Sequence, residues 1–279
     1  MSYSQESVLA VTSNDGKIYQ NFYTRLKESL DKGTKISKIS YSDINNTILN
    51  SSSTVVSIGA KAAKSVSKYK INANVIYSFI PDDELLQSKI PCKKTTCYKI
   101  YINQPVNRYV QLFKALFPEG KKLAFAHTEK NSIKSQQVKS ALKKNDLIYK
   151  DIHIQKDNNA SRIFINELNN DDVLLALPNH YIYNSENAKS IILSTYHANV
   201  PIIAYSKSFA KAGALISLYS SVDNVADKTA KIIGSIIVDG TLSQKEYYPD
   251  DFMIEINSAV ARSLNINISS ENILKSKIR

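Results

Sequence analysis

The chain has 279 residues, 43% of them hydrophobic, which is enough for two lobes of ordinary domain size, each with its own core. Its net charge is +11, but only five of the 36 basic residues are arginine and the lysines are spread along the whole chain. This pattern disfavours nucleic-acid binding, which concentrates basic residues and prefers arginine, and the lack of an apolar run near 18 residues excludes a membrane-spanning helix.

The first half of the chain alternates between strand and helix patterns. Strands are predicted at 8–12, 36–39, 54–58, 74–79 and 98–102. Helical spacing of apolar residues follows the first strand at 18–30, and an Ala/Lys-rich helix follows the third at 60–69. A further helix begins at Pro105 and is stopped by Pro118.

The same alternation restarts at residue 123. Strands are predicted at 123–126, 147–154, 173–177 and 201–205, with helices between them. Such alternation is typical of parallel sheets covered by helices on both faces. We therefore predict an α/β protein of two Rossmann-like lobes joined by a hinge. Lobe one comprises residues 1–103 and about 217–245, and lobe two comprises 104–216. The sequence leaves residues 246–279 open between the two lobes, with lobe two as the favoured assignment.

The two cysteines, Cys92 and Cys97, are separated by four residues in a Lys/Thr-rich loop. A structural metal site needs about four ligands, and no histidine or second cysteine pair lies nearby. A small-loop disulfide is therefore favoured, with two unpaired thiols as the alternative. A disulfide would indicate an oxidising compartment.

Candidate binding residues follow the predicted strands, because open α/β sheets bind ligands at the carboxyl ends of their strands. Each has a plainer alternative role: an N-cap, a tight turn, a core aromatic or a surface histidine. In lobe one the candidates are Ser13, Asn14, Gly59, Ala60, Tyr77 and Ser78. In lobe two they are His127, Thr128, Asn179, Tyr183, Ser206 and Phe209.

The position of the arginines bears on the class of ligand. None of the five lies in a predicted strand-end loop, although a ligand carboxylate usually meets an arginine fork. A carboxylate would instead rely on backbone N–H groups, hydroxyls or a lysine such as Lys61. The tyrosines and amides suit a neutral or aromatic small molecule equally well.

Several segments resemble the ABC-transporter substrate-binding proteins that include tryptophan- and tyrosine-binding lipoproteins. The resemblance runs along nearly the whole chain, and its strand-proline-strand and Ala-Gly-Ala pieces are fairly specific in combination. It rests on residues 55–63 (VVSIGAKAA), 101–105 (YINQP), 175–179 (LALPN), 200–206 (VPIIAYS), 212–215 (AGAL), 256–257 (IN) and 260–264 (VARSL).

The resemblance implies a type I periplasmic-binding-protein fold that captures a small molecule between its lobes by hinge closure. It also implies an ABC permease as membrane partner, a monomeric state, no cofactor and no metal. The location would be the periplasm or the outer face of the cytoplasmic membrane. The chain enters its first predicted strand at Val8 without a leader or lipobox, as expected of an exported protein whose leader is removed or of a cytoplasmic protein.

Three other functions must be weighed against solute binding for transport. An enzyme is disfavoured, because no nucleophile elbow, phosphate-binding loop or dense metal cluster is present. A sugar-repressor-like effector domain is disfavoured, because no DNA-binding segment precedes Val8. A ligand-sensing module that signals to a membrane receptor or sensor kinase remains open, since fold does not decide function.

Overall fold

The computed structural model describes residues 6–87, 90, 92, 96–118, 120–129, 132–155 and 159–278. The chain divides into two compact units. Unit 1 consists of Met1–Asn103 with Ser220–Phe252, and unit 2 of Gln104–Tyr219 with Met253–Arg279. The described part of the chain contains no helix long and apolar enough to cross a membrane.

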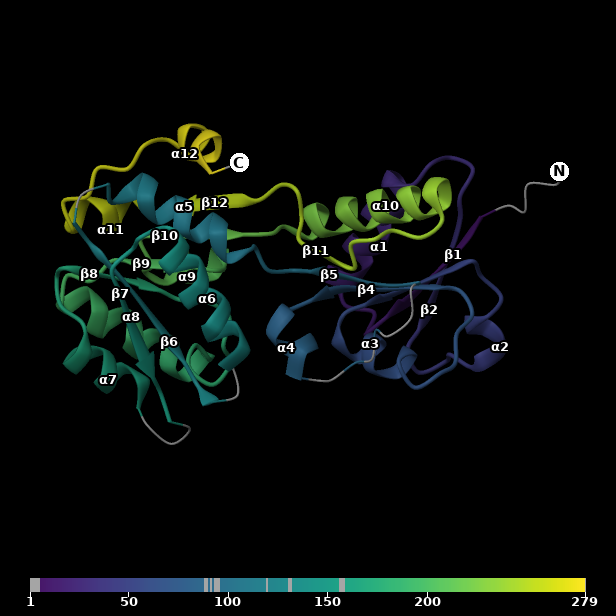
Figure 1. Cartoon of the computed structure of the whole chain (residues 1–279), viewed down its shortest axis with the longest axis horizontal. Coiled ribbons are helices and arrows are strands. Elements are labelled where there is room, and N and C mark those ends of the chain that lie inside the picture. Colours follow the sequence, from purple (N-terminus) through teal and green to yellow (C-terminus); the bar gives the residue numbers. More distant parts are fainter. Residues whose placement is uncertain are drawn as a thin grey trace. The chain divides into compact units, whose positions relative to one another are not determined.

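Unit 1 contains a sheet of parallel strands in the order β11-β5-β4-β3-β1-β2 (Figure 1). Its central strands are buried on both faces, as their Val- and Ile-rich sequences predict. The strands are β1 (Ser7–Thr12), β2 (Lys35–Ser40), β3 (Thr54–Ile58), β4 (Asn74–Ile80), β5 (Cys97–Tyr101) and β11 (Glu246–Tyr247). The helices are α1 (Lys17–Ser29), α2 (Asn46–Leu49), α3 (Ala60–Val66), α4 (Asp82–Gln87) and α10 (Val222–Asp239).

Two hydrophobic cores cover the faces of this sheet. The core on one face joins Phe22 and Leu26 of α1 to Ile233 of α10, and a bidentate ion pair between Arg25 and Asp227 links the same two helices. The core on the other face includes Ala62 and Ala63 of α3. Figure 1 shows α1 and α10 on one side of the sheet and α2, α3 and α4 on the other.

Unit 2 contains a second sheet in the order β12-β10-β9-β8-β6-β7. Its strands pair in parallel except β12, which returns antiparallel to β10. The strands are β6 (Lys122–His127), β7 (Tyr149–His153), β8 (Asp172–Leu175), β9 (Ile202–Ala204), β10 (Ile216–Tyr219) and β12 (Met253–Ile256). The helices are α5 (Val106–Leu116), α6 (Ser132–Lys144), α7 (Ala160–Glu167), α8 (Ser185–His197), α9 (Lys207–Ala212), α11 (Ser258–Ser263) and α12 (Glu271–Lys277).

The chain passes between the units after Asn103, after Tyr219 and after Phe252. The second and third crossings come later than the expected positions near 217 and 246, because β10 belongs wholly to unit 2 and β11 pairs with β5 in unit 1. β11 has only two residues, too few for an alternation pattern to be recognised. The C-terminal segment returns to unit 2, where α12 packs on α5 and β12.

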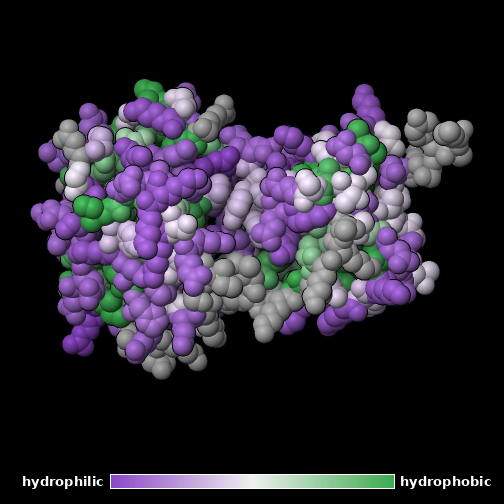
Figure 2. Space-filling model, in the orientation of Figure 1, coloured by the Kyte–Doolittle hydropathy of each residue, from purple (hydrophilic) through white to green (hydrophobic). Residues whose placement is uncertain are grey.

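The surface of each unit carries mostly hydrophilic residues on the face shown in Figure 2. Apolar residues on that face lie in small separated groups rather than in one continuous patch.

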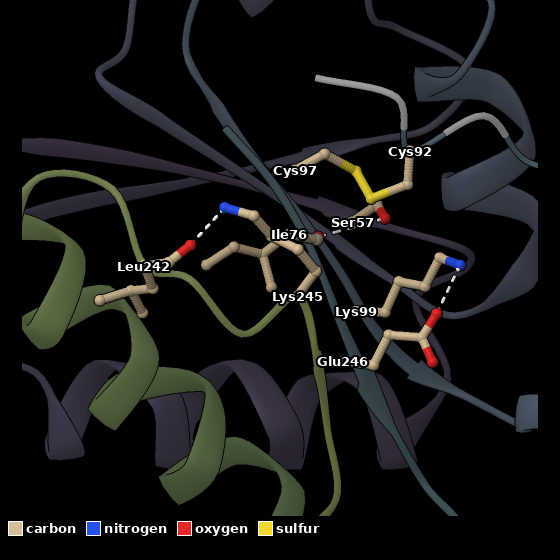
Figure 3. Close-up of a disulfide and its surroundings, with 8 residues drawn as sticks. All are labelled: Ser57, Ile76, Cys92, Cys97, Lys99, Leu242, Lys245 and Glu246. Atoms are coloured by element: carbon tan, nitrogen blue, oxygen red, sulfur yellow. Dashed lines mark hydrogen bonds and ion pairs between the residues drawn. A yellow bond between two sulfur atoms is a disulfide. The ribbon is translucent and has the colours of Figure 1, made fainter. Parts of the chain in front are cut away.

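A disulfide joins Cys92 to Cys97, with their Cα atoms 5.4 Å apart (Figure 3). Cys97 is the first residue of β5 and is buried in the core that also contains Tyr77. The favoured pairing from the sequence is the one in the structure, although residues 93–95 of the loop lie outside the described residues.

Reduction of this disulfide should lower the free energy of unfolding by about 2 kcal/mol, because the unfolded chain regains the entropy that the short closed loop removes. Urea unfolding with and without dithiothreitol measures the difference. Cys92→Ala should unfold at the same urea concentration in both conditions and serves as the control. A wild-type midpoint that does not move on reduction would show that the bridge contributes nothing.

Candidate ligand-binding edges

The strand order defines one switch point in each sheet. In unit 1 the chain proceeds from β1 to β2 on one side and then to β3 on the other, so the switch lies between β1 and β3. In unit 2 it lies between β6 and β8 for the same reason. Open α/β sheets bind ligands beyond the carboxyl ends of the strands at such points, because the two following loops diverge and leave a crevice.

Ser13 occupies the unit 1 switch point and is fully hydrogen-bonded within the protein. Its hydroxyl donates to the carbonyl oxygen of Ile58 at 2.9 Å and accepts from the backbone N–H of Ala62 at 2.9 Å. The side chain is buried and ties the end of β3 to the first turn of α3. Ser13 thus shapes the edge, and its hydroxyl is already occupied.

Asn14 follows on the exposed surface of the same loop. Its Oδ1 accepts from the backbone N–H of Gly16, the N-cap residue of α1, at 2.7 Å. This contact is an Asx turn before the helix and not an N-cap, because Gly16 is the N-cap residue and no side chain caps α1. The exposed position of Asn14 leaves it available to a solute.

Gly59 ends β3 with φ +88°, a conformation that only glycine adopts without strain. A Cβ at this position would lie 2.7 Å from Ser13 Oγ and 2.7 Å from Tyr19 Cε1. Gly59 is therefore required both by its backbone conformation and by the close approach of these side chains. The next residue, Ala60, is half-buried and begins α3.

Two aromatic residues, Tyr19 and Phe79, lie at the same edge of the sheet. The sequence did not single out Tyr19, whereas Phe79 ends the strand predicted at 74–79, where an aromatic could stack on a ligand or belong to the core. Tyr19, in the first turn of α1, is half-buried, and its ring meets Phe79 edge-on with centroids 6.0 Å apart. Phe79 has φ +60° at a register irregularity between Ser78 and Ile80, so β4 is distorted where it reaches the edge. The left-handed backbone of Phe79 could not be predicted, because no sequence pattern marks this conformation at a bulky residue. Tyr19 could have been recognised as a candidate, because it lies in the first helical turn after a strand-end loop.

Tyr77 and Ser78 lie inside β4 rather than in a loop. Tyr77 packs in the core on the α3 side, and burial raises the pKa of its phenol to about 12. The Ser78 hydroxyl lies 2.8 Å from the Thr229 hydroxyl of α10, fully buried. Both residues are therefore part of the core, which was the alternative to ligand binding in the sequence analysis. We do not include them in the proposed ligand contacts.

His127 ends β6 in unit 2 and is held by charged neighbours. Its Nε2 lies 2.9 Å from Asp151 Oδ1, and Lys139 of α6 pairs with the other oxygen of the same carboxylate. Its ring also lies beside His153, with centroids 5.2 Å apart. The side chain is thus engaged on the β7 side, away from β8.

Three buried polar atoms near the unit 2 switch point have no hydrogen-bond partner among the residues that the structure describes. They are Thr128 Oγ1, Asn179 Nδ2 and Tyr183 Oη. Thr128 directly follows β6, and Asn179 and Tyr183 belong to the loop that follows β8. The other atom of the Asn179 amide, Oδ1, accepts from the backbone N–H groups of Tyr181 and Ile182 at 3.1 and 3.4 Å.

Tyr183 is the centre of an aromatic cluster at the same edge. Its ring stacks on Phe164 of α7 and meets Phe209 of α9 edge-on, and Phe209 also contacts Tyr205. Burial, and next the neighbouring Tyr205, raise the pKa of Tyr183 well above its usual value, so the phenol keeps its proton. Phe209 is a core residue of this cluster.

Ser206 is the N-cap residue of α9. Its hydroxyl accepts from the backbone N–H of Phe209 at 3.3 Å and lies 3.0 Å from the Ser208 hydroxyl. The structure thus brings Thr128, Asn179 and Tyr183 to one edge, with Ser206 capping the helix that follows the next strand. Within the described ranges no group of His, Cys, Asp or Glu side chains could hold a metal ion.

The chain belongs to the ABC transporter substrate binding protein family, whose model matches residues 17–278. Among curated proteins, none matches the chain.

Solved structures show the same fold. A substrate binding protein with adhesive properties from Clostridium difficile, in its ligand-free, open structure, has a TM-score of 0.71 at 13% identity, covering 95% of this chain and 97% of that one. A conserved domain protein from Vibrio cholerae has a TM-score of 0.61 at 15% identity, covering 97% and 98%. The ABC domain in complex with L-Trp from Streptococcus pneumonia has a TM-score of 0.59 at 18% identity and covers 98% of each chain. The fold is that of type I periplasmic-binding proteins.

Proposed function

We propose that this chain is the extracytoplasmic solute-binding component of an ABC importer and captures a small amino-acid-like, aromatic or neutral solute. The observation that carries the proposal is the pair of switch-point edges, one with a half-buried tyrosine beside an obligatory glycine and one with unpaired buried polar atoms. Family membership supports a binding role rather than a catalytic one. The disulfide supports an oxidising compartment outside the cytoplasm.

The proposed contacts divide by unit. Unit 1 would supply Asn14, Gly59, Ala60 and Tyr19, and unit 2 would supply Thr128, Asn179 and Tyr183. Tyr19 and the unit 2 aromatic cluster favour a flat solute, since aromatic rings bind such groups by stacking. The similar structure that holds L-Trp supports an aromatic amino acid as the first candidate. The proposed membrane partner is an ABC permease, and the proposed solution state is a monomer.

A thermal-shift screen of amino acids, nucleobases, vitamins and small peptides should find a solute that raises the midpoint of unfolding. At about 100 times its Kd, such a solute stabilises the folded state by about 2.7 kcal/mol. Calorimetry should then give one site per chain, and Tyr19→Ala should weaken binding more than Ile18→Ala, an exposed neighbour on the same helix. Equal affinities of these two variants would contradict the assignment of the unit 1 edge.

A further inference from the structure

Three unpaired polar atoms are gathered in unit 2 where a sheet of this class binds its ligand. Buried polar atoms are nearly always hydrogen-bonded, and each one left unpaired costs free energy in the folded state. Thr128, Asn179 and Tyr183 are 6%, 4% and 5% exposed, so solvent does not compensate these atoms. These atoms therefore call for a partner that the described residues do not supply.

The three side chains come from loops that meet at one edge. β6 and β8 are adjacent strands with Phe125 opposite Leu175, so the segments that follow them leave the sheet side by side. Ala124 and Ala126 pack against the core that contains Tyr183, and strand alternation directs Thr128 toward the same face. Thr128 and Tyr183 thus belong to the same side of the sheet.

The chemistry of the three atoms selects the group they can bind. The Asn179 Nδ2 is a donor only, and the hydroxyls of Thr128 and Tyr183 can both donate. No cation belongs to this set. An oxygen with several free lone pairs satisfies such donors, whereas an ammonium group would leave the Asn179 Nδ2 unpaired.

We infer that Thr128, Asn179 and Tyr183 form a subsite of neutral hydrogen-bond donors in unit 2 for a carboxylate or carbonyl oxygen of the bound solute. The inference rests on the proposed function and specifies which part of the solute this unit recognises. All three atoms are covered in this structure, so a solute reaches them only when the groups around them move. The subsite selects acids and amides over the corresponding amines.

Thr128→Val and Tyr183→Phe test the subsite, because each removes a hydroxyl and keeps the shape of the side chain. Asn179 is less suitable, since its Oδ1 also holds the turn that precedes α8. Ser217→Ala is the matched control: Ser217 Oγ is likewise buried and unpaired, but Ser217 lies within β10 rather than in a strand-end loop. Thr128→Ser keeps the hydroxyl and should restore binding.

The probes are L-tryptophan, L-tyrosine and L-leucine, each compared by calorimetry with its primary amide and with the amine that lacks the carboxyl carbon. The wild-type chain should bind the acid and the amide of at least one set and should bind the amine at least tenfold more weakly. Thr128→Val and Tyr183→Phe should each reduce affinity for the acid by roughly ten- to a hundred-fold. Ser217→Ala should retain wild-type affinity.

Urea unfolding of the solute-free variants separates this subsite from an internal structural role. Thr128→Val, Tyr183→Phe and Ser217→Ala should all unfold at or above the wild-type midpoint, because each removes an unpaired polar atom. A lower midpoint for Thr128→Val or Tyr183→Phe would mean that the hydroxyl has an internal partner and would overturn the inference. Unchanged affinity in these two variants, or an amine bound as tightly as its acid, would also overturn it.

The failure of this inference is distinguishable from failure of the proposed function. If no compound of the three sets binds while another solute of the screen does, the proposed function stands and the inference is overturned. If the wild-type chain binds nothing in the screen, both are overturned.

Discussion

Gly59→Ala is expected to lower the free energy of unfolding by about 2–5 kcal/mol. The left-handed backbone at φ +88° costs an L-residue about 1–2 kcal/mol. The new methyl group would lie within 2.7 Å of Ser13 Oγ and of the Tyr19 ring, and crowding of this kind costs about 1–3 kcal/mol more. Urea or thermal unfolding of the solute-free protein measures the loss.

The expected damage extends to the unit 1 edge. Ser13 Oγ is held by Ile58 and Ala62, so Tyr19 is the side chain with more freedom to move. Displacement of Tyr19 should weaken solute binding in calorimetry. Gly234→Ala is the control: Gly234 lies inside α10 with open space where the added methyl group would stand, so alanine should stabilise that helix by up to about 1 kcal/mol. Equal stability of the two variants would show that neither the conformation nor the close approach at Gly59 matters.

Phe22→Ala is expected to lower the free energy of unfolding by about 3–5 kcal/mol. Phe22 is fully buried between α1 and the sheet, and its ring lies 5.2 Å from that of Phe79, centroid to centroid. Its removal leaves a cavity and withdraws support from the distorted end of β4. Chemical denaturation with a two-state fit gives the change.

Ile18→Ala on the same helix controls for helix propensity, since Ile18 is 48% exposed and should change stability by less than about 0.5 kcal/mol. Phe22→Leu should recover part of the loss, because it refills part of the cavity. A loss for Phe22→Ala as small as that for Ile18→Ala would mean that unit 1 repacks around the vacancy.

The local sequence pattern predicted the long helices and strands, but it did not predict the short ones. The strand predicted at 54–58 coincides with β3, because an uninterrupted buried run between polar segments has few other interpretations. The strand predicted at 201–205 is reduced to Ile202–Ala204 in β9, since pairing with its neighbours sets its ends. β11 has two residues and depends on its partner β5, so no local signal marks it.

The candidate sites divide in the same manner. Strand-end position predicts that Thr128, Asn179 and Tyr183 follow neighbouring strands, and in the structure they do follow β6 and β8, which pair in parallel. The sequence could not show whether Ser78 lies in a strand-end loop or inside the strand. Its buried position depends on a contact with Thr229, which is distant in the sequence. Nor could the sequence predict the left-handed backbone of Phe79, which accompanies the register shift between β4 and β5.

By itself, the sequence determined the α/β class, the restart of the fold at residue 123 and the favoured pairing of Cys92 with Cys97, since periodicity and local spacing carry that information. Only the tertiary structure decided which polar atoms are satisfied and which are not. The Ser13 hydroxyl makes two hydrogen bonds, to Ile58 and Ala62, whereas the Thr128 hydroxyl has no partner among the described residues. That distinction depends on contacts between distant segments, and no local pattern of residues encodes it.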